Sequence, residues 1–373
     1  MTSNPTLRAL WIALALAVAT YVLYLPTSHF AWLNVGDDVR VTDNSHVYSG
    51  ITVANVRWAL IHTHAGNWHP ITWISHMLDS SLWGENASKP HRLNAALHAL
   101  NTALLFVLLY AMTGATWRCA LVAALFGWHP LNVESVAWIS QRKDVLGVFF
   151  WLLTTLAYVL HARRPSIFRI MLVTLFFALG VMTNPLLAML PFTLLLLDTW
   201  PLRRLRAASP AYEENEDDFP RSTPRKIILE KLPLFALAGA AAVMVFLALR
   251  HDDWLINPWQ ASLALRLENA PIACLTYLAG TFYPANLFAF YPWPATIPLW
   301  KTALALAILC GITAGAILQR RQRPWLIVGW LWYLVTLVPV VLLAQAGRQS
   351  MADHYAYVPL VGVFLCVAWS LGE

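Results

Sequence analysis

The sequence predicts an all-α polytopic membrane protein, a bundle of about 10–11 transmembrane helices with a large first outer loop that carries interfacial helices. Hydrophobic residues make up 59% of the 373 residues and charged residues only 12%, about half the charged share of a soluble domain. The chain also holds 19 Trp and 12 Tyr, side chains that gather at membrane–water interfaces. These observations exclude a soluble protein of this size.

The apolar stretches divide the chain into ten expected membrane spans, since a helix needs about 20 apolar residues to cross the hydrocarbon core. The first span has no small-residue cleavage site and is therefore expected to be retained rather than removed as a signal peptide. The ten spans are Leu7–Leu25, Arg92–Met112, Trp117–Trp128, Asp144–His161, Phe168–Met182, Pro185–Trp200, Leu232–Leu249, Leu299–Leu318, Trp325–Leu343 and Tyr355–Leu371. Another apolar stretch, Ser262–Tyr283, contains Arg266 and Glu268 and is predicted to lie at the interface without crossing.

The distribution of charge predicts the orientation. With a cytoplasmic N-terminus, 15 of the 25 basic residues fall in cytoplasmic segments, which satisfies the positive-inside rule. The net charge of +6 is thus a topology signal, and no nucleic-acid partner is expected. We expect one transmembrane domain over residues 1–373, with outer loops at 26–91 and 250–298 and a cytoplasmic loop at 201–231. The four cysteines lie in apolar stretches without CxxC spacing and predict neither disulfides nor a thiolate metal site.

Three polar groups are predicted to meet on the outer face. Asp37 and Asp38 follow the first span, and adjacent carboxylates can act as a general base or as metal ligands. Arg142 and Lys143, with Asp144, stand on the outer face against the charge bias, where a phosphate would explain them. The third group precedes the last span and contains Arg348, Asp353 and His354. For the first two groups, a turn and snorkelling at the headgroups are the structural alternatives.

Histidines in the first outer loop raise the question of a metal. His62, His64 and His69 lie within eight residues and could ligate zinc with a carboxylate such as Asp37. Because their spacing matches no zinc motif, a Trp- and His-rich surface loop explains them equally well, and the metal is left open. His98 and Asn101 in the second span are expected to form hydrogen bonds between helices.

Several blocks of the chain together resemble a known family. They are Asp37-Asp38, Gly66-Asn67-Trp68-His69-Pro70-Ile71-Thr72-Trp73, His129-Pro130-Leu131-Asn132-Val133-Glu134-Ser135, Gln141-Arg142-Lys143-Asp144, Tyr283-Pro284-Ala285-Asn286-Leu287 and Ala352-Asp353-His354-Tyr355-Ala356-Tyr357-Val358-Pro359. In this order they resemble the membrane part of bacterial tetratricopeptide-repeat proteins related to the animal transmembrane and tetratricopeptide-repeat-containing O-mannosyltransferases. These proteins belong to the GT-C class of glycosyltransferases. The chain departs from the bacterial pattern at Asn132, Asn184 and His354, where His, Lys and Arg are usual.

The resemblance implies a GT-C-like fold and a function. It implies an enzyme that transfers a sugar from a polyprenyl-phosphate-linked donor to an acceptor hydroxyl of a protein or glycan, with inversion. The site would lie at the periplasmic face of a bacterial inner membrane, in contact with membrane lipid, and dependence on a divalent metal is left open. A repeat domain is expected beyond residue 373, so the chain is interpreted as a fragment.

The resemblance also assigns roles to residues of this chain. Asp37 or Asp38 is implied at the catalytic centre, and Arg142 and Lys143 at the donor phosphate. Arg348 is added to the phosphate site from the predicted topology. Supporting or substrate-binding positions are expected at His69, His129, Glu134, Asp144, Asp353, His354 and Tyr355. Two other functions stay open at this point, a transporter or flippase for a lipid-linked sugar and a non-catalytic membrane anchor for the repeat domain.

Overall fold

The computed structural model describes residues 5–34, 36–205, 219–251, 261–285, 287–342 and 349–372. All ten expected spans are helical within these residues. The helices are α1 (Pro5–Tyr24), α5 (Ser88–Thr113), α6 (Thr116–Trp128), α8 (Arg142–Arg163), α9 (Ile167–Thr183), α10 (Leu190–Thr199), α11 (Pro224–His251), α13 (Leu299–Gln319), α14 (Pro324–Leu342) and α15 (Pro359–Ser370). Five helical segments are long and apolar enough to cross a membrane, and four shorter apolar helices accompany them. The predicted fold class, an all-α polytopic membrane protein, is confirmed.

Further elements lie in the connections between these helices. The helical ones are η1 (Leu25–His29), η2 (Asp38–Thr42), α2 (Ser45–Tyr48), α3 (Val53–Ile61), α4 (Pro70–Trp83), η3 (Pro130–Asn132), α7 (Val133–Ala137), η4 (Ile139–Gln141), η5 (Pro185–Met189), α12 (Leu263–Phe282) and η7 (Asp353–Ala356). Two short antiparallel strands, β1 (Tyr291–Pro292) and β2 (Gln349–Met351), pair between the 250–298 loop and the segment before α15. They tie two loops together that are distant in the sequence.

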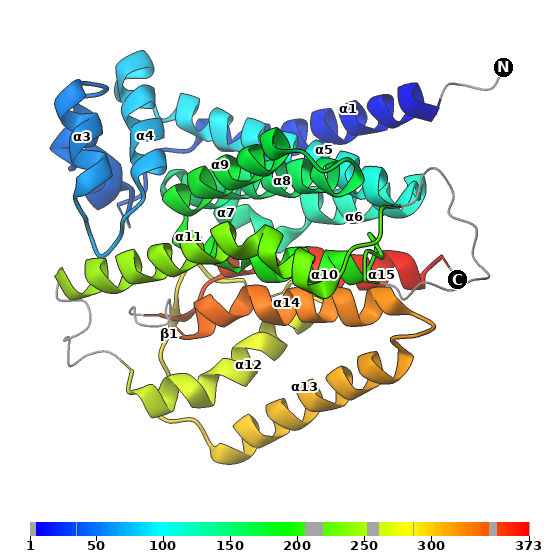
Figure 1. The fold of residues 1–373 in the computed structure, drawn as a ribbon. Helices are drawn as coiled ribbons and strands as arrows, with labels where there is room; N and C mark the ends of the chain where they lie inside the picture. Colours follow the sequence, from blue (N-terminus) through cyan, green and yellow to red (C-terminus); the bar gives the residue numbers. More distant parts are fainter. Residues whose placement is uncertain are drawn as a thin grey trace.

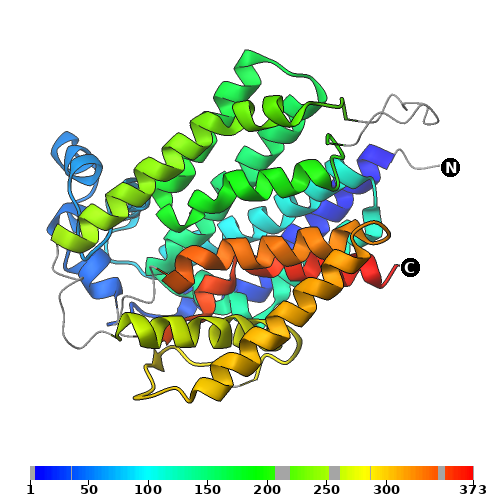
Figure 2. The ribbon, with the colours of Figure 1, turned by 60° about the horizontal axis from the view of Figure 1, so that its bottom comes forward.

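The long helices lie alongside one another in a bundle (Figures 1 and 2), and different side chains meet at its two ends. At one end the start of α1, the start of α6 and the end of α15 meet, because Arg8 stacks on Trp117 and Arg118 donates to the carbonyl of Gly372. We call it the basic end. At the other end lie α3, α4, α7 and β1 (Figure 1), and we call it the site end. The charge asymmetry predicted from the sequence thus separates the ends of one bundle, while its orientation in a membrane stays a prediction.

Polar and small side chains hold the bundle together, as interhelical packing in a membrane requires. His98 of α5 contacts the hydroxyl of Tyr357 at 2.6 Å and the carbonyl of Gly127 at 3.0 Å. Asn101, one turn further along α5, donates to the carbonyl of Val145 in α8 at 2.7 Å. These contacts confirm the expectation that both residues bond between helices.

Helices α14 and α15 approach each other closely at a pair of glycines. A Cβ atom on Gly362 would lie 2.3 Å from the carbonyl oxygen of Gly329, and one on Gly329 would lie 2.4 Å from that of Gly362. Only glycine leaves room for this contact between the two backbones. The pair therefore places the N-terminal end of α15, and with it η7, next to α14.

A network of buried charges at the basic end was not anticipated from the sequence. Asp198 of α10 accepts from Lys231 at 2.5 Å, from Arg204 at 3.2 Å and from the Tyr158 hydroxyl at 2.7 Å. Arg204 also pairs with Glu230 at 3.0 Å. Because every charge has an opposite partner, the network joins α8, α10 and α11 without leaving a buried charge uncompensated.

Helix α12 occupies the stretch predicted to lie at the interface. The Ser262 side chain caps its first turn, accepting from the amide of Leu265. The Thr302 hydroxyl in the first turn of α13 donates to the carbonyl of Glu268 in the first half of α12. The start of α13 therefore lies beside the N-terminal half of α12. This arrangement is what a segment that does not cross would show, and its position in a membrane stays a prediction.

Candidate functional site

The first outer loop places Asp37 and Asp38 at the site end, and Asp37 anchors the loop there. Its side chain is fully buried, and it accepts hydrogen bonds from the backbone amide of Leu33 at 3.0 Å and of Ser140 at 2.8 Å. The hydroxyl of Ser140 donates to the same carboxylate. Asp37 therefore fixes the loop against η4, directly before Arg142 and Lys143.

The neighbouring Asp38 has a different environment. It is half-buried and begins η2, a single π-helical turn closed by the bond from the Asp43 amide to its carbonyl, a geometry often found at functional sites. Backbone amides of Val39 and Gly36 donate to its carboxylate and hold the pKa of Asp38 below its usual value. Asp38 is accordingly ionised at neutral pH and partly accessible.

The same turn presents Arg40, a residue that the sequence analysis did not select. Its guanidinium lies beside Gly36, within 3.5 Å of where a Cβ would stand. Gly36 has φ of +99°, a conformation that favours glycine, so the turn that presents Arg40 depends on this residue. Burial lowers the pKa of Arg40, while Tyr355 and Asp37 act in the opposite direction. The sequence signal for Arg40 was a basic side chain on the expected outer face, three residues after Asp37.

Lys143 lies in the first turn of α8 and is the most unusual charge of the site. Its side chain is only 9% exposed, and within the described residues no hydrogen bond or ion pair is made by its ammonium group. The neighbouring charges that act on it are Asp144, Arg40 and Glu134. An ammonium largely shielded from water and without a direct partner among the described residues is costly, which favours an anion as its partner.

Glu134 and His354 join α7 to η7 on the other side of the site. One Glu134 oxygen lies 2.8 Å from His354 Nδ1, and the other accepts from the His354 amide at 2.8 Å. Burial raises the pKa of Glu134, but the charge and hydrogen bonds of His354 outweigh it and leave that pKa below its usual value. This pair positions the segment before α15.

Asp353 is oriented by the strand pair. The hydroxyl of Tyr291 in β1 donates to its carboxylate at 2.9 Å. Burial, reinforced by the negative charge of Glu134, raises the pKa of Asp353 to about 6. Asp353 therefore titrates close to neutral pH, and Tyr291 is a second residue of the site end that sequence reasoning missed.

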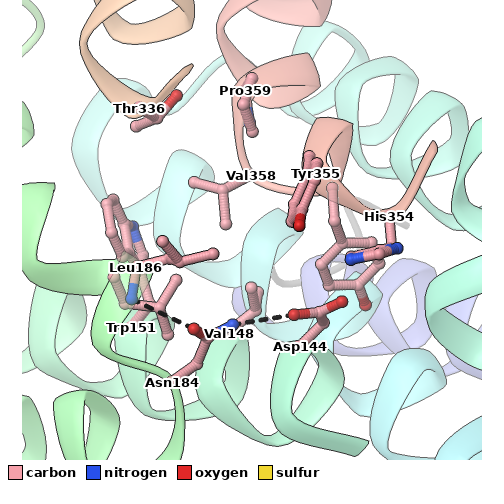
Figure 3. Close-up of a pocket in the computed structure, with 12 residues that line it drawn as sticks. Asp144, Val148, Trp151, Asn184, Leu186, Thr336, His354, Tyr355, Val358 and Pro359 are labelled. Carbon is pink, nitrogen blue, oxygen red and sulfur yellow. Dashed lines mark hydrogen bonds between the residues drawn. The ribbon is translucent and has the colours of Figure 1, made fainter. Parts of the chain in front are cut away.

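Asp144 and Tyr355 border a narrow cavity of about 40 Å³ at the site end (Figure 3). Asp144 accepts from the side-chain Nδ2 of Asn184 at 2.8 Å and from the Ser135 hydroxyl at 3.5 Å. Asn184 also caps η5 by accepting from the Leu186 amide, so the break between α9 and η5 supports Asp144. The cavity is wide enough for a few water-sized groups.

Arg142 has different partners from those expected of a phosphate ligand. Its guanidinium pairs with Asp79 of α4 at 2.8 Å and donates to Ser75 at 3.0 Å and to the carbonyl of Pro90 at 3.1 Å. Its Nε donates to Asn94, and the side chain is 0% exposed. Every nitrogen therefore binds protein, so the geometry assigns Arg142 to fastening α4 against α5 and α8 rather than to the donor phosphate.

The histidines divide into structural and site-facing ones. His129 accepts from the Leu131 amide and contacts the carbonyl of Thr281 at 3.0 Å, so both ring nitrogens are used. His69 is half-buried, and burial, together with the charges of Lys143 and Arg40, holds its pKa well below the usual value. His69 is thus a neutral ring next to the two cations.

His62 and His64, the other two histidines considered for a metal, pack on an aromatic ring. His62 and His64 lie 6.3 and 6.0 Å from the ring of Trp58, and His64 Nε2 lies 2.9 Å from the carbonyl of Val39. Within the described ranges, no three His, Cys, Asp or Glu side chains are arranged to hold a metal ion. Arg348, the remaining predicted phosphate ligand, lies outside the described residues.

The fold and this end of the bundle define a polytopic helical membrane protein with a polar site that contains carboxylates and the cations Arg40 and Lys143. Part of the chain is related to the protein O-mannosyl-transferases. It is 32% identical to mouse protein O-mannosyl-transferase TMTC2 over 107 residues, which are 28% of this chain and 13% of the mouse protein. Over 152 residues it is 31% identical to Tmtc2 and 30% identical to Tmtc1 of Drosophila melanogaster, covering 38% of this chain. The matches span only 13 to 17% of these three relatives. No family model matches the chain.

Proposed function

We propose that this protein is a membrane glycosyltransferase of the GT-C type that moves a sugar from a polyprenyl-phosphate-linked donor to an acceptor hydroxyl of a protein or glycan. The observation that carries the proposal is Lys143, a nearly buried ammonium without a direct partner among the described residues, placed near Arg40 and the acidic turn at Asp38. The names of the relatives support transfer of mannose to protein. In our proposal the site end faces the periplasm of a bacterial inner membrane.

The donor phosphate binds between Arg40 and Lys143. Arg offers a planar fork and Lys a compact point charge, and both suit phosphate oxygens. Arg40 takes the place that the sequence analysis gave to Arg142, because the donors of Arg142 already bind Asp79, Ser75, Pro90 and Asn94. The neutral ring of His69 adds no positive charge and borders the same space.

Asp38 acts as the general base, and Asp37 positions it. Asp37 is buried and accepts from three donors, whereas Asp38 is half-buried and ionised at neutral pH. A base needs a free lone pair within reach of the acceptor proton. Between the two carboxylates, Asp38 satisfies this requirement better.

The reaction exchanges one bond for another at the anomeric carbon. Asp38 takes the proton of the acceptor hydroxyl as its oxygen attacks C1 of the sugar from the face opposite the phosphate. The bond from C1 to the phosphate oxygen breaks, and its electron pair leaves with the polyprenyl phosphate. The phosphate changes from a singly charged diester towards a doubly charged monoester, so Arg40 and Lys143 stabilise the transition state more than the bound donor.

A transfer assay with the full-length protein tests this function. Purified protein in detergent or nanodiscs is incubated with radiolabelled polyprenyl-phosphate mannose and candidate acceptor peptides. Asp38→Asn is expected to lower turnover by about 100-fold or more, as loss of a general base does, and Lys143→Gln to weaken donor use. The matched controls are Asp43→Asn, in the same loop, and Lys89→Gln, both at exposed positions.

The alternatives give different results in the same preparation. An anchor shows no transfer with any donor and acceptor, although folding is intact. A flippase moves labelled donor between the leaflets of a vesicle without forming product. Normal turnover by Asp38→Asn would contradict the assignment of the base.

A further inference from the structure

A cavity of about 340 Å³ opens at the basic end, far from the proposed transferase site. It lies between the loop after α10 and the turn from α13 to α14, which are more than a hundred residues apart in the chain. Three arginines border it, Arg203 from the first segment and Arg320 and Arg321 from the second. We call it the basic pocket. None of the described residues that line it is acidic.

Among the described residues, no acidic side chain pairs with the three guanidinium groups. All three side chains are exposed, and in the part of the chain that the structure describes none forms a side-chain hydrogen bond or ion pair. The adjacent Arg204 shows the contrast, because it is buried and bonded to Asp198 and Glu230. Like charges gathered at one cavity repel each other, and an anion bound among them would remove that repulsion.

The backbone around the pocket favours the same ligand. Arg203 has φ of +53°, a left-handed conformation that a long side chain rarely adopts and that is often found at functional positions. Helix α14 begins at Pro324, whose side chain lines the pocket. The N-terminal end of a 19-residue helix carries a partial positive charge that adds to the field of the arginines.

The surroundings indicate a lipid rather than a soluble anion. Ile327 and Val328 of α14 form an apolar wall of the pocket. Trp200, also in the lining, packs on Trp325 and Trp369 at centroid distances of 6.4 and 5.2 Å, and clustered tryptophans mark the headgroup level of a membrane. In the last turn of α13, Leu318 is 84% exposed and offers an apolar surface on which acyl chains would lie.

We propose that the basic pocket binds the phosphate headgroup of an anionic membrane phospholipid, with Arg203, Arg320 and Arg321 as its ligands and the chains against the end of α13. Basic pockets between helices on the cytoplasmic side bind such headgroups, and the predicted orientation places this end there. The site is independent of the transferase chemistry, because it lies at the opposite end of the bundle.

The test measures lipid binding by the full chain in detergent micelles, with phosphatidylglycerol and phosphatidylcholine as probes. We expect phosphatidylglycerol to bind at least about 10-fold more tightly than phosphatidylcholine, with an affinity that falls as salt rises. The variant R203Q/R320Q/R321Q is expected to lose this preference. The control R164Q/R225Q/K226Q removes the same charge from exposed positions at the same end outside the pocket and should keep it.

Two further arms complete the experiment. Inorganic phosphate and glycerol phosphate at millimolar concentration should not displace phosphatidylglycerol, and displacement by either would overturn the assignment to a lipid. Equal binding by the pocket triple variant and the control would overturn the site itself. If the triple variant does not fold, the single variants R203Q, R320Q and R321Q decide, each expected to weaken binding about three-fold or more against R164Q.

Discussion

Removal of Arg142 distinguishes a structural ion pair from a phosphate ligand. Arg142 is 0% exposed and pairs at 2.8 Å with Asp79, whose side chain is 5% exposed. In Arg142→Gln the Asp79 carboxylate loses its counter-charge, and breaking a buried pair from one side costs about 3–5 kcal/mol of unfolding free energy. The bonds to Ser75 and the carbonyl of Pro90 are also weakened, which places the expected loss in the upper part of that range.

The measurement is unfolding of the purified protein in mixed micelles by a denaturing detergent, followed by tryptophan fluorescence. The double variant Arg142→Gln with Asp79→Asn should recover much of the lost free energy, because it no longer buries an unpaired charge. Burial raises the pKa of Asp79, but Arg142 and His76 outweigh it and lower that pKa. The pair therefore stabilises the fold above the ordinary Asp pKa of about 4 and loses this contribution as the pH falls. A donor-binding defect in Arg142→Gln with unchanged stability would refute the reasoning.

Three further predictions concern other parts of the bundle. Asp353→Asn should have the same free energy of unfolding as the wild type below about pH 4 and be more stable by about 3 kcal/mol at pH 8. The reason is the raised pKa of Asp353, about 6, because of which the wild type loses that amount of stability as the pH rises between those values. Parallel pH–stability curves of the two proteins would refute this prediction. Asp198→Asn should cost about 3–5 kcal/mol in the same unfolding assay by leaving Lys231 unpaired, with donor binding per folded molecule unchanged; a binding defect would contradict its structural role. Gly362→Ala should cost about 1–3 kcal/mol from the overlap with Gly329, whereas Gly311→Ala, with nothing near its Cβ, should be neutral or slightly stabilising.

The helical plan of the bundle could be predicted because it depends on local properties. Apolar length predicted a helix at each of the ten expected spans, and the polar residues Arg266 and Glu268 set α12 apart from them. The separation of charge between the bundle ends followed from the positive-inside rule. Even the bonds of His98 and Asn101 were predictable, since a buried polar side chain in a membrane helix requires a partner.

Which side chains meet at the site end depended on long-range geometry instead. Arg142 and Lys143 are adjacent in sequence, yet the Arg142 guanidinium pairs with Asp79, whereas the Lys143 ammonium has no direct partner in the part of the chain that the structure describes. Nothing in the sequence marks Asp79 as a partner, because it lies more than sixty residues earlier in another helix. Arg40 was missed for the same reason, since its charge acquires meaning only when η2 folds against η4.

The network around Asp198 shows a second limit of sequence reasoning. Asp198 stands at the end of an apolar stretch, where a lone acid is easily interpreted as the boundary of a span. Its partners Arg204 and Lys231 come from the 201–231 loop, which holds seven basic and six acidic residues, so the sequence does not indicate which charges pair. Their pairing requires α10 and α11 to be adjacent, and hydrophobic periodicity does not determine that adjacency.

Donor affinity at Lys143 tests the central claim most directly. Binding of polyprenyl-phosphate mannose to the full-length protein is measured for the wild type, Lys143→Gln, Lys143→Arg and the exposed control Lys89→Gln. Loss of a buried charge-assisted contact costs about 2–5 kcal/mol, so Lys143→Gln should bind the donor about 30-fold more weakly or worse. Lys143→Arg should retain part of the affinity, and Lys89→Gln all of it. Equal donor affinity for the wild type and Lys143→Gln, with both proteins folded, would contradict the claim that this ammonium holds the donor phosphate.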